Sequence, residues 1–147
     1  MAKVLELKSL TFVRHSYAVA SSEFPGSDGD RPLTEKGTEA AHALDQALAN
    51  SVPPPDLILV SDALRARQTL HELVKYCAGK PEIKVLRELY DCSAGQLYNI
   101  ILENQAGRAH LCVIGHNPAV SQLYSMLSGE YCALSPAQSR TLLLEDK

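Results

Sequence analysis

The amino-acid sequence predicts an α/β fold, a three-layer α/β/α sandwich with a mostly parallel central sheet. Short apolar runs that suit buried strands alternate with segments whose apolar residues recur at helical spacing. Two of the runs, 57–60 and 111–114, are apolar throughout, as in strands that are covered on both faces. No repeat, low-complexity tract or interdomain linker interrupts this pattern, so we expect a single domain over residues 1–147.

The composition is ordinary for a globular protein, with 46% hydrophobic and 21% charged residues among 147. The net charge of −3 indicates no broad basic surface, so we expect no nucleic-acid partner. The four cysteines stand far apart without a CxxC pair, which favours free thiols in a reducing compartment over disulfides or a cysteine zinc site. Because the first nine residues alternate charged and apolar side chains and no run is long enough to span a bilayer, we predict a cytoplasmic protein with no membrane partner.

The first strand is expected where a short apolar segment, residues 10–13, runs into a basic pair. A loop rich in Ser, Gly, Asp and Pro follows over residues 21–32. Thr34 is then expected to cap a helix that ends before the prolines at 53–55. The inner face of this helix is expected to comprise Ala40, Leu44, Ala47 and Leu48.

The apolar run at 57–60 is the second expected strand, and Ser61 and Asp62 after it are suitable caps for a second helix. This helix is expected to continue until Gly79 and Pro81 stop it. Its inner face is expected to comprise Ala66, Leu70, Leu73, Val74 and Cys77.

The second half of the chain continues the alternation of strands and helices. Pro118 suits the first position of a helix, with Asn117 before it as the cap and Gly129 at its end. The other elements are expected at 83–86, 111–114 and 141–144 for strands and at 95–105 for a helix.

Polar side chains of a consistent kind follow four successive strands. In an open α/β sheet, ligands bind beyond the carboxyl ends of the strands, so these side chains are expected to meet there. Helix starts at the same edge favour phosphate through free amide donors and a positive partial charge. The side chains are Arg14 and His15 after the first strand, Arg65 after the second, Glu88 and Asp91 after the third, and His116 after the fourth.

These residue types, gathered in one place, predict phosphoryl transfer. Two arginines can each grip the oxygens of a phosphoryl group with their forked donors. One histidine can be the nucleophile, since neighbouring arginine charges favour its neutral form, and the other can donate to the transferring group. A carboxyl group can protonate the leaving atom and then activate water. The chain has no Gly-rich phosphate loop of the Walker type and no clear metal–carboxylate cluster, so we expect no metal and no cofactor.

Each of these residues also has an ordinary structural interpretation. Arg65 could pair with Asp62 on its own helix, and His116 could serve as a structural residue at a helix start. Glu88 could be a surface carboxylate. Two other functions remain open. One is a module that binds phosphate without turnover. The other is a zinc hydrolase with His15 and His116 as ligands, although the two arginines would repel a dication. Solvated or surface positions without a role are expected for His42, Arg67, His71 and His110.

Four segments resemble those of a known family, in the family's order. Residues 13–16 (VRHS) are similar to the Arg-His-Gly signature of the histidine phosphatase (phosphoglycerate mutase-like) superfamily. Residues 31–37 resemble its RPLTxxG segment, 61–69 its SxxxRAxQT segment and 114–118 its xGHxP segment. With little inserted between its third and fourth expected strands, the chain resembles the small SixA-like phosphohistidine phosphatase branch.

The resemblance implies a phosphoglycerate mutase-like fold and a metal-independent phosphatase. His15 is then the phosphorylated nucleophile, and Arg14, Arg65 and His116 complete the phosphate pocket. The implied substrate is a phosphomonoester or a phosphoramidate, in this branch the phosphohistidine of another protein. A phosphatase of small metabolites is the alternative.

Further site residues are assigned from the same resemblance. Ser16 stands where the family has Gly, and it either narrows the pocket or donates its hydroxyl to the phosphate. Asn117, next to the second histidine, is expected to contact the phosphate as well. Glu88 matches the place of the family's proton donor, with Asp91 as the second choice.

Overall fold

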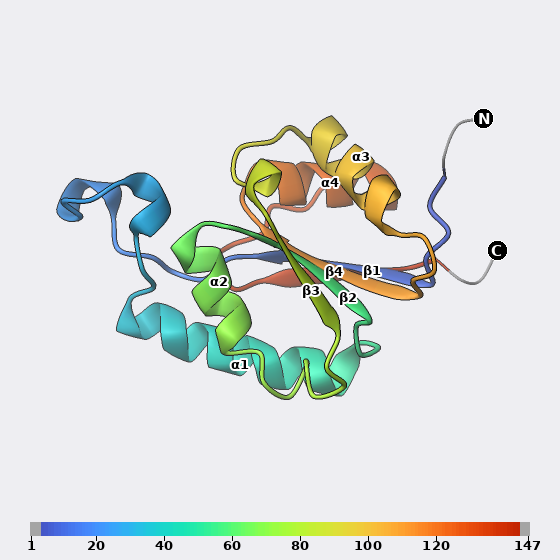
Figure 1. Ribbon diagram of the computed structural model, residues 1–147, viewed down its shortest axis with the longest axis horizontal. Helices are drawn as coiled ribbons and strands as arrows, with labels where there is room; N and C mark the ends of the chain where they lie inside the picture. The colour runs from blue at the N-terminus through green and yellow to red at the C-terminus, as the bar shows by residue number, and fades with distance from the viewer. Residues whose placement is uncertain (1–3, 145–147) are drawn as a thin grey trace.

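The computed structural model describes residues 4–144 and contains a five-stranded sheet between two layers of helices (Figure 1). The strand order is β3-β2-β4-β1-β5. Four strands run parallel, and β5 pairs antiparallel with β1 at one edge. The strands are β1 (Ser9–Arg14), β2 (Leu57–Ser61), β3 (Glu82–Leu86), β4 (His110–Gly115) and β5 (Ser139–Leu143). The predicted fold class, with a mostly parallel central sheet, is confirmed.

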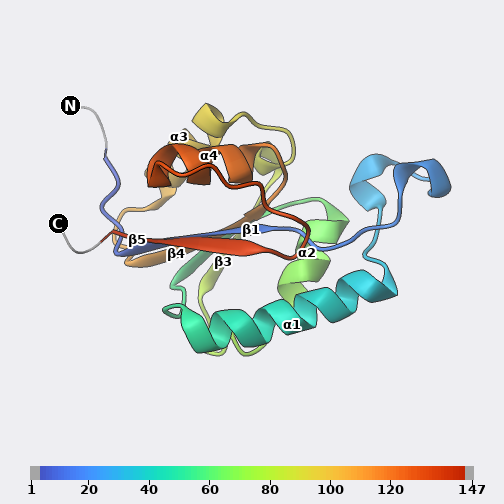
Figure 2. The same cartoon turned by 180° about the vertical axis from the view of Figure 1, so that it is seen from behind.

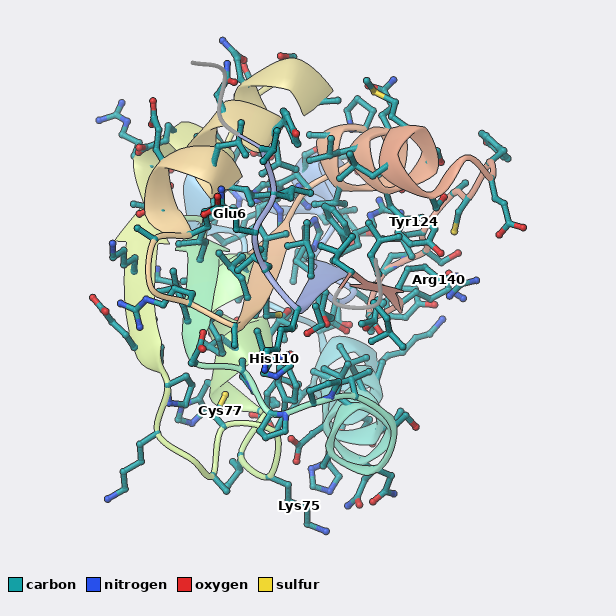
Figure 3. All side chains as sticks on the ribbon, turned by 90° about the vertical axis from the view of Figure 1, so that its right-hand side faces the viewer. Glu6, Lys75, Cys77, His110, Tyr124 and Arg140 are labelled. Atoms are coloured by element: carbon teal, nitrogen blue, oxygen red, sulfur yellow. The ribbon has the colours of Figure 1, made fainter. Side chains whose placement is uncertain are left out.

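Two helices cover each face of the sheet (Figure 2). They are α1 (Glu35–Ser51) and α2 (Leu64–His71) on one face, and α3 (Ala94–Asn104) and α4 (Ala119–Ser128) on the other. Successive side chains of a strand point to opposite faces, so Phe12 packs in the core under α3 and α4 while Val13 packs in the core under α1 and α2. Figure 3 shows the layers from the end of the sheet where His110 lies.

The parallel register brings the ends of the central strands to one edge. Arg14 at the end of β1 is paired with Gly115 at the end of β4, and Val60 of β2 is paired with Ile114. The segments that follow β1, β2 and β4 therefore leave the sheet side by side. This arrangement positions the polar residues on which the site depends.

The helix α2 differs from the predicted helix at both ends. Ala63 is its N-cap, and Ser61, the last residue of β2, accepts a hydrogen bond from the Ala63 amide instead of capping the helix. The helix ends at His71, and the chain then turns around Asp45 of α1, whose buried carboxylate accepts from the amides of residues 75 and 76. Val74, predicted to face inward, is 70% exposed as a result.

Two smaller predictions about helices were also wrong. Ala47 of α1 is exposed, and Ala41 is buried in its place. Asn117 does not cap α4, because Pro118 is the N-cap and the Asn117 amide donates to the carbonyl of Leu134 in the loop before β5. The predicted end of α4 at residue 129 is confirmed, where glycine adopts a left-handed conformation with φ of 79°.

The structure also bears on the cysteines and on membrane spans. All four cysteines are free thiols, as predicted. Among residues 4–144, no helix combines the length and the apolar character needed to cross a bilayer. Residues 1–3, part of the N-terminal segment from which a cytoplasmic location is predicted, lie outside the described residues. The cytoplasmic location and the single domain over 1–147 stay predictions.

Candidate active site

A polar cavity of about 350 Å³ lies at the carboxyl edge of the sheet. It brings together most of the predicted site residues and adds two that were not predicted, Asp28 and Tyr90. We call its deeper part the floor (Arg14, His15 and His116) and its exposed side the mouth (Asp28, Tyr90 and Asp91). Arg65 and Asn117 complete the lining.

His15, the nucleophile predicted from the sequence, is held in one tautomer. Its Nδ1 lies 2.8 Å from the carbonyl oxygen of Ser16, and since a carbonyl only accepts, Nδ1 carries the proton. Burial lowers the pKa of His15 to about 4; the Ser16 hydrogen bond opposes this shift, and the charges of Arg65 and Arg14 reinforce it. The ring is therefore neutral near pH 7, with its lone pair on Nε2.

His116 faces His15 across the floor. The two ring centroids are 5.0 Å apart, and the Nε2 of His116 lies 2.8 Å from the hydroxyl oxygen of Ser61. Burial, with smaller contributions from the nearby His15 and Arg65, lowers the pKa of His116 to about 3. The ring of Tyr90 packs perpendicular to it, with the two centroids 5.5 Å apart. A neutral imidazole in this place offers one N–H donor beside the nucleophile.

The two arginines each keep a donor without a partner. Arg14 donates from Nη1 to the carbonyl of Leu134 at 3.1 Å, and Arg65 donates from Nη1 to the carbonyl of Asp28 at 2.8 Å. Within the described residues, the Nε atoms of both arginines are buried and have no hydrogen-bond partner. Both side chains line the cavity and carry a positive charge, which suits a site for an oxyanion.

The segment 31–37 supports the turn that follows His15. Thr34 caps α1 by accepting from the amide of Gly37 at 2.9 Å, as predicted. A Cβ on Gly37 would lie 2.0 Å from the carbonyl oxygen of Tyr17, so only glycine lets the start of α1 approach the backbone next to the nucleophile. The Gly37 carbonyl also accepts from the hydroxyl of Ser16 at 2.7 Å.

The segment 61–69 joins α2 to the same turn. Thr69 donates from its hydroxyl to the carbonyl of Arg65 and accepts from the amide of Ser16 at 2.9 Å. Gln68 accepts from the amide of Leu33 at 2.7 Å. In this segment Arg65 reaches the cavity, while Thr69 and Gln68 fix the backbone of the segments that lead to and from it.

Ser16 does not take either role expected of it. Its side chain is fully buried, it does not line the cavity, and its hydroxyl proton is donated to the Gly37 carbonyl. The structure therefore does not support a contact between Ser16 and the phosphate. Serine replaces glycine here as a packing and hydrogen-bonding residue beneath the site.

The structure separates the two predicted carboxylates. Asp91 lines the cavity at its mouth, whereas Glu88 is exposed and lines an adjoining hollow with Arg87. The short 3₁₀ helix η3 (Arg87–Leu89) turns the chain between them. Glu88, the first choice for the proton donor, is therefore not brought together with the histidines.

Asp28 is one of the two cavity residues that were not predicted from the sequence. Its carboxylate accepts from Arg31 at 2.9 Å, from Arg65 at 3.2 Å and from the hydroxyl of Tyr90. The Tyr90 hydrogen bond, followed by the contacts with the arginines, lowers the pKa of Asp28 to about 2. In the sequence, Asp28 stands three residues before Arg31, and this spacing could have indicated that the two side chains form an ion pair. The alternative pairing of Arg65 with Asp62 is wrong, because Arg65 pairs with Asp28.

The remaining histidines and Arg67 behave nearly as expected. His42, His71 and Arg67 are exposed, while His110 is half-buried and makes a 2.7 Å hydrogen bond with Ser9 at the other end of the sheet. Among residues 4–144, no three His, Cys, Asp or Glu side chains gather closely enough to hold a metal ion. The zinc-hydrolase alternative therefore lacks a ligand set in the part of the chain that the structure describes.

Comparison with known proteins identifies the family. The model of the histidine phosphatase superfamily (branch 1) matches residues 10–128, and the chain belongs to this superfamily. Within it the chain is SixA-like: phosphohistidine phosphatase SixA of Escherichia coli is 34% identical over 118 residues, which cover 78% of this chain and 71% of SixA. An uncharacterized chloroplastic protein of Arabidopsis thaliana is 31% identical over 144 residues, covering 92% of this chain and 66% of its own length.

Solved structures agree with this assignment. The protein histidine phosphatase SixA complexed with tungstate has a TM-score of 0.72 and 29% identity, covering 86% of this chain and 81% of that one. The alpha-ribazole phosphatase of Shigella flexneri shares the fold at 16% identity, with a TM-score of 0.69 over 90% of this chain and 89% of its own. The chain thus spans about two thirds of the length of the curated relatives and most of the length of these structures.

Proposed function

We propose that this protein is a phosphatase that hydrolyses a phosphomonoester or phosphoramidate in two in-line transfers, with the phosphoryl group carried by Nε2 of His15. The hydrogen bond from Nδ1 to the Ser16 carbonyl carries the proposal, because it leaves Nε2 as the ring nitrogen with a lone pair. The lowered pKa of His15 supports the same assignment, since a protonated ring cannot attack phosphorus.

In the first transfer, the lone pair of Nε2 forms the N–P bond while the bond from phosphorus to the leaving atom breaks and its electron pair goes to that atom. The ring keeps its Nδ1 proton and becomes positively charged, which strengthens its hydrogen bond to the Ser16 carbonyl. In the second transfer, water attacks phosphorus and gives one proton to Asp91, and the N–P electron pair returns to Nε2. The histidine is thereby restored to its neutral state.

The other residues of the pocket are assigned to the transferring phosphoryl group. The guanidinium groups of Arg14 and Arg65 suit its equatorial oxygens, and His116 and Asn117 offer further donors at the same cavity. With Glu88 outside the cavity, we assign acid–base help to Asp91, the second choice from the sequence, which lines the mouth.

Protein phosphohistidine is the substrate class that we propose. SixA of E. coli, one of the relatives, is a phosphohistidine phosphatase, and a SixA structure holds tungstate, a tetrahedral oxyanion like phosphate. The exposed mouth of the cavity supports a phosphorylated side chain on another protein. A P–N bond also needs little help from an acid, which suits a pocket whose first-choice donor lies outside.

The experiment that tests this function is trapping of the phosphoenzyme. Labelled substrate should leave an acid-labile, alkali-stable label on the protein, and His15→Ala should remove both label and turnover. His42→Ala, a change at an exposed histidine of α1, is the matched control and should keep both. Label that survives in His15→Ala would refute the assignment.

Substrate preference is measured in the same assay. A phosphohistidine-bearing protein should be hydrolysed in preference to sugar phosphates, and a chelator should leave the rate unchanged. A clear preference for a sugar phosphate would replace the proposed substrate with a small metabolite. Binding of phosphate without any turnover would replace the enzyme with a binding module.

A further inference from the structure

A carboxylate at the mouth of a phosphate pocket calls for an explanation, because it repels the anion that the pocket is built to hold. Asp28 is fixed there by donors from three elements of the chain: Arg31 in its own loop, Arg65 on α2 and Tyr90 after η3. Its side chain is 49% exposed, while that of Arg65 is 7% exposed. Asp28 is therefore a rigidly held negative charge that remains open to an incoming ligand.

The carboxylate still has room for one hydrogen bond. Its Oδ2 accepts from both Arg65 and Tyr90, and its Oδ1 accepts from Arg31. A carboxylate offers about four acceptor positions, two on each oxygen. One position on Oδ1 is therefore left for a donor that enters the cavity.

The leaving group of the substrate is expected on the side of Asp28. In an in-line transfer, the leaving atom departs on the side of phosphorus opposite to the attacking nitrogen. His15 lies on the floor at the end of β1, so the leaving group points outward to the mouth. Asp28, Tyr90 and Asp91 line the cavity there.

We propose that Asp28 is the residue that makes this site selective for phosphoramidates, whose leaving nitrogen belongs to a protonated, cationic group, over phosphate esters, whose leaving oxygen is anionic. This inference rests on the proposed function and names the chemistry of its substrate. Asp28 acts on the leaving group and not on the phosphoryl group itself.

The selection follows from where the proton lies. A phosphorylated imidazole binds a proton on its free nitrogen, and that N–H can donate to Oδ1 of Asp28. When Nε2 of His15 attacks, the P–N bond breaks, its electron pair goes to the departing nitrogen, and the substrate ring leaves as neutral imidazole with its proton. An ester oxygen departs with a negative charge and has no N–H, so Asp28 repels it.

The test compares two leaving groups in one variant, Asp28→Asn. Asparagine has the same shape and keeps a carbonyl oxygen for the arginines, but it removes the negative charge. For phosphohistidine we expect kcat/KM to fall about 10- to 100-fold, the range for loss of a hydrogen bond between charged groups. For p-nitrophenyl phosphate, whose leaving group is an anion, we expect kcat/KM to stay within about threefold or to rise.

The ratio of the two kcat/KM values separates selection from positioning. If Asp28 served only to hold Arg65, kcat/KM would fall by the same factor for both substrates. The ratio would then be unchanged, and that result would overturn the inference. Asp30→Asn removes the same charge two residues away, outside the cavity, and should leave the ratio unaltered. Trapping of label on His15 in Asp28→Asn shows independently whether the phosphatase chemistry holds.

Discussion

The floor and the mouth of the cavity are built in different ways. In the floor, Arg14 ends β1, His15 follows it and His116 follows β4. The amide of His15 donates to the carbonyl of Gly115 in continuation of the sheet. The mouth comes from loops that leave the sheet: Asp28 belongs to the segment between β1 and α1, which extends beyond the layers in Figure 1, and it is held by side-chain contacts. Backbone pairing thus fixes the chemistry, while side-chain contacts fix the surroundings of the leaving group.

Arg65 tests this division most strongly, because it pairs with Asp28 of the mouth and also lines the cavity in which we place the phosphoryl group. We expect Arg65→Ala to lower kcat/KM by about 2–4 kcal/mol, or about 30- to 1,000-fold, as for loss of one donor to the transition state. Steady-state kinetics with p-nitrophenyl phosphate measures this loss.

Arg67→Ala is the matched control for that change. Arg67 lies on the same helix, is exposed, and donates to the Asp62 carbonyl. It should keep kcat/KM within about twofold. If Arg65→Ala were as mild as Arg67→Ala, the phosphoryl group would not be bound where we place it.

A pH titration can test the charge states of His15 and His116, the two histidines of the floor. Since the pKa of His15 is about 4 and that of His116 about 3, both rings should remain neutral from pH 8 down to about 5. An ordinary histidine with a pKa of about 6.5 is mostly protonated at pH 5. NMR shifts of the two rings in the free protein measure this directly. A midpoint near 6.5 for His15 would show that burial and the neighbouring arginines do not lower its pKa.

The same shifts have a consequence for stability. The pKa values of His15 and His116 in the folded protein lie below the unfolded value of about 6.5. At pH values between the folded and unfolded pKa, the unfolded chain therefore binds more protons than the folded protein. The free energy of unfolding should therefore fall as the pH is lowered from about 6.5 through about 4. In Arg65→Ala the pKa of His15 should rise, since a neighbouring positive charge is removed.

The contrast between floor and mouth also explains what the sequence could predict. Apolar runs locate the central strands, so the residues that follow them, such as His15 and His116, could be placed at one edge without coordinates. Asp28 could not, because its position depends on the path of a loop and on donors that lie 3, 37 and 62 residues away. Glu88 was misplaced for a related reason, since a single turn of 3₁₀ helix decides which carboxylate faces the cavity.

Ser16→Ala is the substitution with the smallest expected effect. It tests whether the residue beneath the floor contributes to stability or to phosphate binding. In Ser16→Ala the 2.7 Å hydrogen bond to the Gly37 carbonyl is lost, which should lower the free energy of unfolding by about 1 kcal/mol. Because the side chain does not line the cavity, kcat/KM should stay within about twofold. Denaturant unfolding and steady-state kinetics measure the two quantities.

A hydroxyl on α1, that of Thr38 next to Gly37, provides the comparison for Ser16. Thr38 is exposed and donates to the carbonyl of Thr34 at 3.3 Å, so Thr38→Ala should change the free energy of unfolding by less than Ser16→Ala does. A rise in KM in Ser16→Ala, without a loss of stability, would mean that the hydroxyl turns to the phosphate during catalysis. An unaltered KM with lower stability would place Ser16 among the residues that hold the floor and take no part in binding.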